Sequence, residues 1–140
     1  MALFSRKTKP TKLQDLSELE PMLDSGKPVL LDFMQINCGP CRIMDGVVNE
    51  LAEEYGESAH IVKVDVTKVA GAAQVFKVRS TPTFVLLSTA PPKKSKKAAK
   101  KAGSKPKTRQ QLSPRWRTQG LVKKDQLQRV LESNGARRPA

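Results

Sequence analysis

Residues 28–44 read P-V-L-L-D-F-M-Q-I-N-C-G-P-C-R-I-M and contain the only two cysteines of the chain, Cys38 and Cys41. Val29–Met34 is an apolar run of strand length with a single charge, Asp32, and such a run is typical of a strand covered on both faces. From Cys38 onward, apolar residues recur at helical spacing. A helix N-terminus offers free backbone N–H groups and partial positive charge, so a sulfur there is more stable as a thiolate. The second cysteine lies one turn further on, close enough to resolve a mixed disulfide.

The charge of the chain is unevenly distributed. The sequence has 140 residues and a net charge of +13, and a chain of this length is expected to form one domain. Residues 91–117 contain eleven Lys or Arg and no Asp or Glu, whereas the rest of the chain carries fifteen basic and thirteen acidic groups. One segment therefore makes the protein basic, and we expect the folded part to be close to neutral.

Several classes of protein are excluded by the same inventory. No apolar run of about 18 residues is present, so no membrane helix is expected. The first ten residues carry charge without an apolar segment after it, which disfavours a secretory signal and indicates a cytoplasmic protein. A structural zinc site needs two ligands besides Cys38 and Cys41, and His60 is the only histidine, so we expect no metal. The C-x-x-C spacing favours a redox pair.

The order of the expected elements indicates an α/β fold. Asp15 and Glu18 fit a capping box that opens a helix over 15–24, and residues 38–56 form a second helix that Gly56 ends. Further along, the patterns predict a strand over 60–66, a short helix over 69–76, a strand over Thr83–Leu87, a short strand over 115–118 and an amphipathic helix over 123–132. Strands that alternate with helices in this way form parallel neighbours in one sheet.

The composition divides the chain into segments. Residues 1–12 are a basic arm, with a short edge strand expected near 11–13. Residues 13–133 form the domain, interrupted by a Lys-rich insertion over 89–114, and residues 134–140 are a polar tail. The insertion contains A-P-P-K-K-S-K-K-A-A-K-K-A-G-S-K-P-K, which is too poor in large apolar residues to form a core, so we expect a flexible loop.

These motifs, in this order, resemble the thioredoxin family. V-L-L-D-F precedes C-G-P-C, then V-K-V-D-V and S-T-P-T-F follow, and a glycine stands before the closing amphipathic helix. The resemblance covers roughly residues 13–88 and 115–133. It implies a central mixed β-sheet of four to five strands flanked by helices on both faces. It also implies a monomeric protein-disulfide reductase without a cofactor, which acts on disulfide-bearing proteins, takes electrons from a thioredoxin-reductase-like donor and contributes to cell redox homeostasis.

The resemblance assigns roles to the C-G-P-C motif. Cys38 is the attacking thiolate, exposed at the helix start, and Cys41 is the more buried resolving thiol. Exchange passes through a mixed disulfide between Cys38 and the substrate. Gly39 and Pro40 set the turn between the sulfurs, and proline is favourable early in a helix.

Asp32 matches the buried acid of the family. In that role, desolvation raises its pKa and it exchanges protons with Cys41 through water. The alternative is a carboxylate at a strand end or sheet edge. Lys63 matches the basic residue near this acid, and a solvated strand lysine is an equally good interpretation.

Pro82, in S-T-P-T, matches the family's cis-proline, which lies opposite the cysteines. A cis X–Pro bond is only about 0.5–1 kcal/mol less favourable than trans. The loop leaves the Thr81 backbone free to pair with an extended substrate segment. The alternative is an ordinary proline at the start of a strand.

The chain departs from the family beside the cysteines. Asn37 and Met34 stand where the family usually has tryptophan, so the flat aromatic surface next to the disulfide is missing. Asn37, Gly39, Pro40, Thr81 and Pro82 remain the residues that we expect to contact substrate.

The Lys-rich segment admits three interpretations. It is a solubilising stretch, a sequence-independent tether to nucleic acid through residues 91–117, or a device that steers acidic protein partners. The corresponding alternative for the whole chain is a binding module of this fold, tethered by its basic segment to nucleic acid or an acidic partner.

Overall fold

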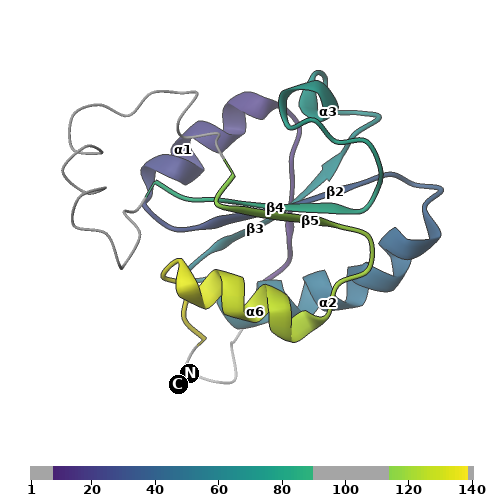
Figure 1. Ribbon diagram of the computed structural model, residues 1–140. Coiled ribbons are helices and arrows are strands. Elements are labelled where there is room, and N and C mark those ends of the chain that lie inside the picture. The colour runs from purple at the N-terminus through teal and green to yellow at the C-terminus, as the bar shows by residue number, and fades with distance from the viewer. Residues whose placement is uncertain (1–7, 90–113, 139–140) are drawn as a thin grey trace.

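The computed structural model describes residues 8–89 and 114–138. Over these residues the chain forms the predicted α/β fold, with a five-stranded mixed sheet between two layers of helices (Figure 1). The elements are β1 (Thr11–Lys12), a 3-10 turn η2 (Leu16–Glu18), α1 (Leu19–Asp24), β2 (Val29–Met34), α2 (Gly39–Tyr55), β3 (His60–Asp65), α3 (Ala72–Val75), β4 (Thr83–Leu87), β5 (Trp116–Gln119) and α6 (Lys124–Ser133). The strand order is β1-β3-β2-β4-β5.

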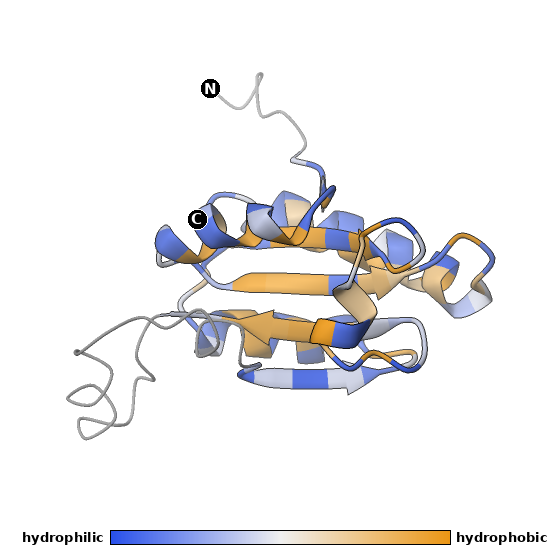
Figure 2. Cartoon of the chain, turned by 90° about the horizontal axis from the view of Figure 1, so that it is seen from above, coloured by the Kyte–Doolittle hydropathy of each residue, from blue (hydrophilic) through white to orange (hydrophobic). Residues whose placement is uncertain are grey.

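The sheet combines parallel and antiparallel pairs. β1, β3 and β2 run parallel, whereas β4 is antiparallel to both β2 and β5. The central position of β2 explains its continuous apolar sequence, because it is hydrogen-bonded on both sides and covered on both faces. Figure 2 shows the central strands as mostly apolar, with a few hydrophilic positions between the apolar ones. No helix among the described residues is long and apolar enough to cross a bilayer.

Two apolar cores lie on opposite faces of the sheet. α1 and α3 cover one face, where Leu23 and Phe33 are buried, and α2 and α6 cover the other, where Leu51 and Leu127 are buried (Figure 1). Because successive strand residues point to opposite faces, Leu30 packs toward α2 and Leu31 packs toward α1. Asp32 has the same parity as Leu30, which places this acid on the face that α2 covers.

Three elements differ in detail from the sequence-based expectation. The Asp15–Glu18 capping box forms, but it opens a 3-10 turn before α1. The helix expected over 69–76 shortens to Ala72–Val75, because Gly71, with φ at 77°, stands at its start in the left-handed region. Ile43 of α2 is 65% exposed, so it is outside the buried stripe of that helix.

The expected Lys-rich insertion over 89–114 falls almost entirely outside the described residues. β4 and β5, which precede and follow it, are antiparallel neighbours. The expected edge strand of the N-terminal arm is present as β1, which pairs with β3.

Candidate functional site

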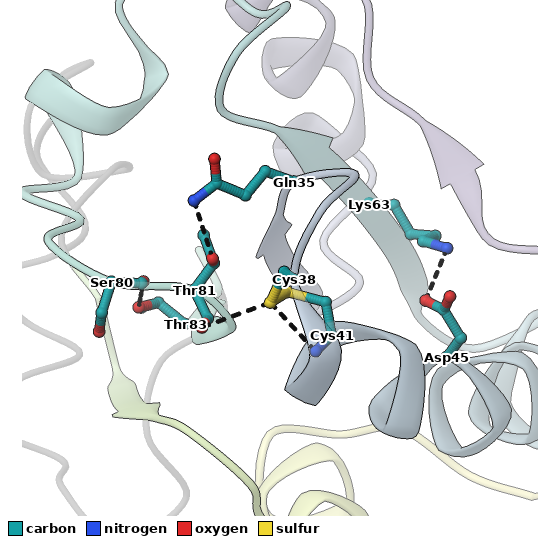
Figure 3. The surroundings of a disulfide bond; sticks show 8 residues. All are labelled: Gln35, Cys38, Cys41, Asp45, Lys63, Ser80, Thr81 and Thr83. Atoms are coloured by element: carbon teal, nitrogen blue, oxygen red, sulfur yellow. Dashed lines mark hydrogen bonds and ion pairs between the residues drawn. A yellow bond between two sulfur atoms is a disulfide. The ribbon is translucent and has the colours of Figure 1, made fainter.

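The two cysteines lie at the N-terminus of α2. Cys38 is the N-cap residue, Gly39 begins the helix and Pro40 follows in its first turn. The Cys41 backbone N–H donates to the Cys38 sulfur at 3.1 Å, so the sulfur accepts one of the N–H groups that the first turn leaves unpaired. Cys38 and Cys41 are joined by a disulfide, with their Cα atoms 5.2 Å apart (Figure 3).

The exposure of the pair differs from the expectation. Cys38 is 7% exposed and Cys41 is 3% exposed, so the first cysteine is buried rather than open to solvent. The cause lies in the loop before β4, since the Thr81 carbonyl oxygen lies 3.5 Å from the Cys38 sulfur. The order of burial is as predicted, with Cys41 deeper. The exposed neighbours on this side include the apolar Ile36, 57% exposed, together with Asn37, Gly39 and Pro40, which form the rim beside the disulfide.

The loop opposite the sulfurs contains the predicted cis peptide bond, Thr81–Pro82. Pro82 is buried, and its carbonyl accepts from the Gly120 backbone N–H at 2.8 Å. On the other side of the proline, the Thr83 hydroxyl donates to the Ser80 carbonyl at 2.7 Å. The loop is therefore held to β5 and to itself, and it presents the Thr81 carbonyl to Cys38 (Figure 3).

Asp32 is the one charged side chain in the buried strand β2. It is 2% exposed, and among the described residues neither of its carboxylate oxygens has a hydrogen-bond partner. Burial raises the pKa of Asp32 to about 7, Lys63 opposes this increase and Asp45 adds to it. A carboxyl group with a pKa near neutrality exchanges a proton readily at physiological pH.

Lys63 lies directly across from Asp32 in the β2–β3 register. Its ammonium nevertheless bonds to Asp45 Oδ1 of α2 at 2.9 Å, and its side chain is 18% exposed (Figure 3). Lys63 is therefore a half-buried, paired lysine close enough to Asp32 to lower its pKa, not a solvated strand residue.

Two polar residues of the site were absent from the sequence-based set. Asp45 lies one helical turn after Cys41, and this spacing is the feature of the sequence that could have placed it near the site. Gln35 follows β2, and its side-chain amide donates to the Thr81 hydroxyl oxygen at 3.1 Å. Finding Gln35 requires the register between β2 and β4, which the sequence does not give.

His60 and Trp116 lie in surroundings that support a role in the fold. His60 Nε2 lies 3.0 Å from the Ser25 hydroxyl, at the start of β3. Trp116, in β5, is half-buried and packs against the core beneath α2 and α6. In the parts of the chain that the structure describes, no three His, Cys, Asp or Glu side chains are grouped as metal ligands.

Known proteins of the same architecture match this chain. The Thioredoxin family profile matches residues 11–113. The chain is 34% identical over 82 residues to "Thioredoxin Y, chloroplastic" of Oryza sativa subsp. japonica, covering 58% of this chain and 49% of that protein. It is 37% identical over 90 residues to "Thioredoxin" of Mycobacterium tuberculosis, covering 64% of this chain and 78% of that protein.

A solved structure extends the match to nearly the whole fold. A single-site mutant of the thioredoxin of Halobacterium salinarum NRC-1 superposes with a TM-score of 0.68 at 27% identity, covering 94% of this chain and 95% of that one. The chain spans about half the length of the chloroplastic relatives that it matches, 49% and 48%. Since the family profile covers most of the chain and the cysteine pair and cis-proline stand where this fold brings them together, the chain belongs to the thioredoxin family.

Proposed function

We propose that the protein catalyses thiol–disulfide exchange and acts as a protein-disulfide reductase. The observation that carries the proposal is the Cys38–Cys41 disulfide at the start of α2, facing the Thr81–Pro82 loop. When this disulfide is reduced, the N–H groups and partial positive charge of the helix N-terminus stabilise the Cys38 thiolate. Membership of the thioredoxin family supports the exchange reaction over the alternative of a binding module without chemistry.

The reaction proceeds in two exchanges. The reduced Cys38 thiolate attacks one sulfur of a substrate disulfide, which forms a mixed disulfide and releases the other substrate sulfur as a thiolate. Cys41 then loses its proton and attacks the Cys38 sulfur, which releases the second substrate sulfur. The substrate gains two electrons, and the protein is left with the Cys38–Cys41 disulfide. A thioredoxin-reductase-like donor returns two electrons in the next cycle.

The neighbouring residues have distinct roles in this scheme. Asp32 accepts the Cys41 proton, which its near-neutral pKa allows. Lys63 adjusts that pKa through its charge. The Thr81 backbone pairs with an extended substrate segment, and disulfide-bearing proteins are the substrate class.

The rim determines which proteins dock. Asn37, Gly39 and Pro40 are exposed beside the buried sulfurs, so a substrate meets these residues before it reaches Cys38. Because a polar Asn37 replaces the usual aromatic side chain and lies beside the exposed Ile36, the rim presents substrate with a mixed polar and apolar surface instead of a flat aromatic one.

Insulin reduction in the presence of dithiothreitol tests the reaction. The wild type accelerates precipitation of the insulin B chain above the dithiothreitol background, and Cys38→Ser does not. Equal rates for the two proteins would refute the proposal. A redox potential near thioredoxin's roughly −270 mV supports a reductase, and one near roughly −120 mV indicates an oxidant.

The basic segment supplies a second contact in this proposal. Of the eleven Lys and Arg in residues 91–117, the nine that precede residue 114 bind nucleic acid or an acidic protein without sequence preference, since Arg117 donates to the Phe76 and Lys77 carbonyls. Retention on RNA or DNA columns at low salt, lost at high salt and on deletion of 89–114, supports this contact. If the deletion variant is retained as strongly as the wild type, the basic segment does not make this contact.

We place the protein in the cytoplasm, where it contributes to redox homeostasis. The support is the C-x-x-C pair, which suits a compartment that keeps thiols reduced. A fluorescent fusion in the source cell tests the location, and signal confined to a plastid, where relatives are found, overturns it.

A further inference from the structure

The hydrogen-bond ladder between β2 and β4 stops next to the cysteines. Its last pair is Phe33 with Thr83, and continuing the same antiparallel register places Gln35 opposite Thr81. Pro82 lies between Thr81 and Thr83, and it has no N–H to donate to a ladder. The backbone pairing therefore ends at Thr83, two residues from Thr81, whose carbonyl faces Cys38.

A side chain continues the connection where the backbone does not. The Gln35 amide donates to the Thr81 hydroxyl oxygen at 3.1 Å and joins two residues 46 positions apart (Figure 3). Both residues are half-buried. The bond joins the end of β2 to the loop before β4, whose Thr81 carbonyl faces the Cys38 sulfur.

The loop has its other attachments on the far side. The Pro82 carbonyl is held by Gly120 of the segment after β5, and the Ser80 hydroxyl donates to the Gln119 side-chain oxygen at 3.2 Å. Gln35 is the contact from the β2 side. The Thr81 carbonyl, 3.5 Å from the Cys38 sulfur, lies between these two sets of attachments.

We propose that Gln35 is a positioning residue for disulfide exchange, which fixes Thr81 so that its backbone receives the substrate segment beside Cys38. This inference rests on the proposed function. Gln35 does not touch the sulfurs, and it acts through the Thr81 side chain. Without the bond, Thr81 samples more orientations and the substrate segment must order it on binding, which weakens association rather than chemistry.

A double-mutant cycle tests the inference. Gln35→Met keeps the side-chain length and removes the amide, Thr81→Val keeps the shape and removes the hydroxyl, and Thr81→Ser keeps the hydroxyl. We expect Gln35→Met and Thr81→Val each to raise KM for a protein disulfide about 3- to 10-fold, the range for loss of one neutral hydrogen bond. The double variant loses no more than either single variant. Thr81→Ser stays within about twofold of the wild type.

Two controls separate positioning from general damage. Gln126→Met, at an exposed position in α6, leaves KM unchanged. Alkylation of reduced Cys38 by iodoacetamide, which requires no docked segment, proceeds at the wild-type rate in Gln35→Met. An unchanged KM in Gln35→Met, or losses that multiply in the double variant, overturns the inference.

A second measurement tests the inference if the protein does not reduce protein disulfides. Equal activity of the wild type and Cys38→Ser would refute the proposed function and leave this inference to a binding measurement. In that measurement, a disulfide-linked peptide is trapped on Cys38 in Cys41→Ser, and proteolytic protection of the peptide is compared with and without Gln35→Met. Lower protection in the variant supports positioning by Gln35, and equal protection overturns it.

Discussion

Lys63 Nζ lies 2.9 Å from Asp45 Oδ1, although the residue directly across the sheet from Lys63 is the buried Asp32. The ammonium thus bonds to the half-exposed carboxylate of α2, and the buried carboxyl has no hydrogen-bond partner among the described residues. Asp45 affects Asp32 in two ways, because it adds a negative charge nearby and holds the compensating cation. The proton affinity of Asp32 is therefore set first by its burial and then by the opposing charges of Lys63 and Asp45.

Asp45→Asn is expected to lower the pKa of Asp32 from its value of about 7. The substitution removes a negative charge that raises this pKa and frees Lys63 to interact with Asp32. The carboxyl chemical shift of Asp32, followed by NMR from pH 4 to 9, measures the change. Asp125→Asn, at an exposed position in α6 whose carboxylate pairs with Arg129, is the matched control and leaves the titration in place. A pKa that is unmoved or higher in Asp45→Asn contradicts the argument.

Asp32→Asn is expected to stabilise the fold above pH 7. The folded pKa of Asp32 is about 7 and its ordinary value is 3.8, so between these values the folded state holds a proton that the unfolded state has released. The wild type therefore loses stability as pH rises through this window, and Asp32→Asn does not. At about 1.4 kcal/mol per pKa unit, the gain approaches ~4 kcal/mol at pH 8 and disappears near pH 4.

Urea unfolding at pH 4, 6 and 8 measures this difference. Asp24→Asn, at an exposed position at the end of α1, is the control and shows no comparable pH-dependent gain. A stability difference between Asp32→Asn and the wild type that stays constant with pH would rule out the buried, proton-holding carboxyl.

Cys41→Ser is expected to accumulate the mixed disulfide. Cys38 still attacks a substrate disulfide, but no second sulfur remains to release the bound protein. Mass spectrometry under non-reducing conditions detects the adduct as the summed mass of the two chains. Cys38→Ser yields no adduct, because Cys41 is the more deeply buried cysteine, 3% exposed against 7% for Cys38. Equal adduct from the two variants would remove the distinction between attacking and resolving cysteines.

Local sequence patterns predicted most of the fold. The bounds of β2 and β4 agree with the apolar runs over Val29–Met34 and Thr83–Leu87, because central strands are apolar along their length. The capping box of Asp15 and Glu18 formed for the same local reason. The cis bond before Pro82 followed from the resemblance to a known family rather than from the residues.

The contacts around the site were not predictable in this way. Asp45 with Lys63 and Gln35 with Thr81 join residues far apart in the sequence, and their pairing depends on the strand register and on which helix face meets the sheet. The burial of Cys38 has the same origin, since the Thr81 carbonyl reaches it from a separate segment. Local sequence patterns do not predict contacts between residues that are far apart in the sequence.

Gly46, inside α2, and Gly56, at its end, are expected to respond oppositely to alanine. A Cβ at Gly46 would meet nothing within 4 Å, and this exposed position is in the helix interior. Gly46→Ala therefore gains about 0.5–1 kcal/mol of stability, because alanine loses less backbone entropy than glycine on folding. Gly56 has φ at −60°, so a left-handed backbone conformation does not explain the glycine at this position.

The reason for Gly56 is close approach. A Cβ there would lie 2.5 Å from the Ala52 carbonyl oxygen and 2.5 Å from the Thr8 methyl carbon, and the first of these contacts is with backbone that cannot move aside. Gly56→Ala is therefore expected to lower the urea midpoint, whereas Gly46→Ala raises it without a change in slope. Thr8→Ala in the Gly56→Ala background removes the contact with the methyl carbon but keeps the Cβ of residue 8 at 2.8 Å and the Ala52 contact, so it restores only part of the loss. A midpoint for Gly56→Ala at or above that of the wild type would mean that the end of α2 shifts without strain to admit the methyl group.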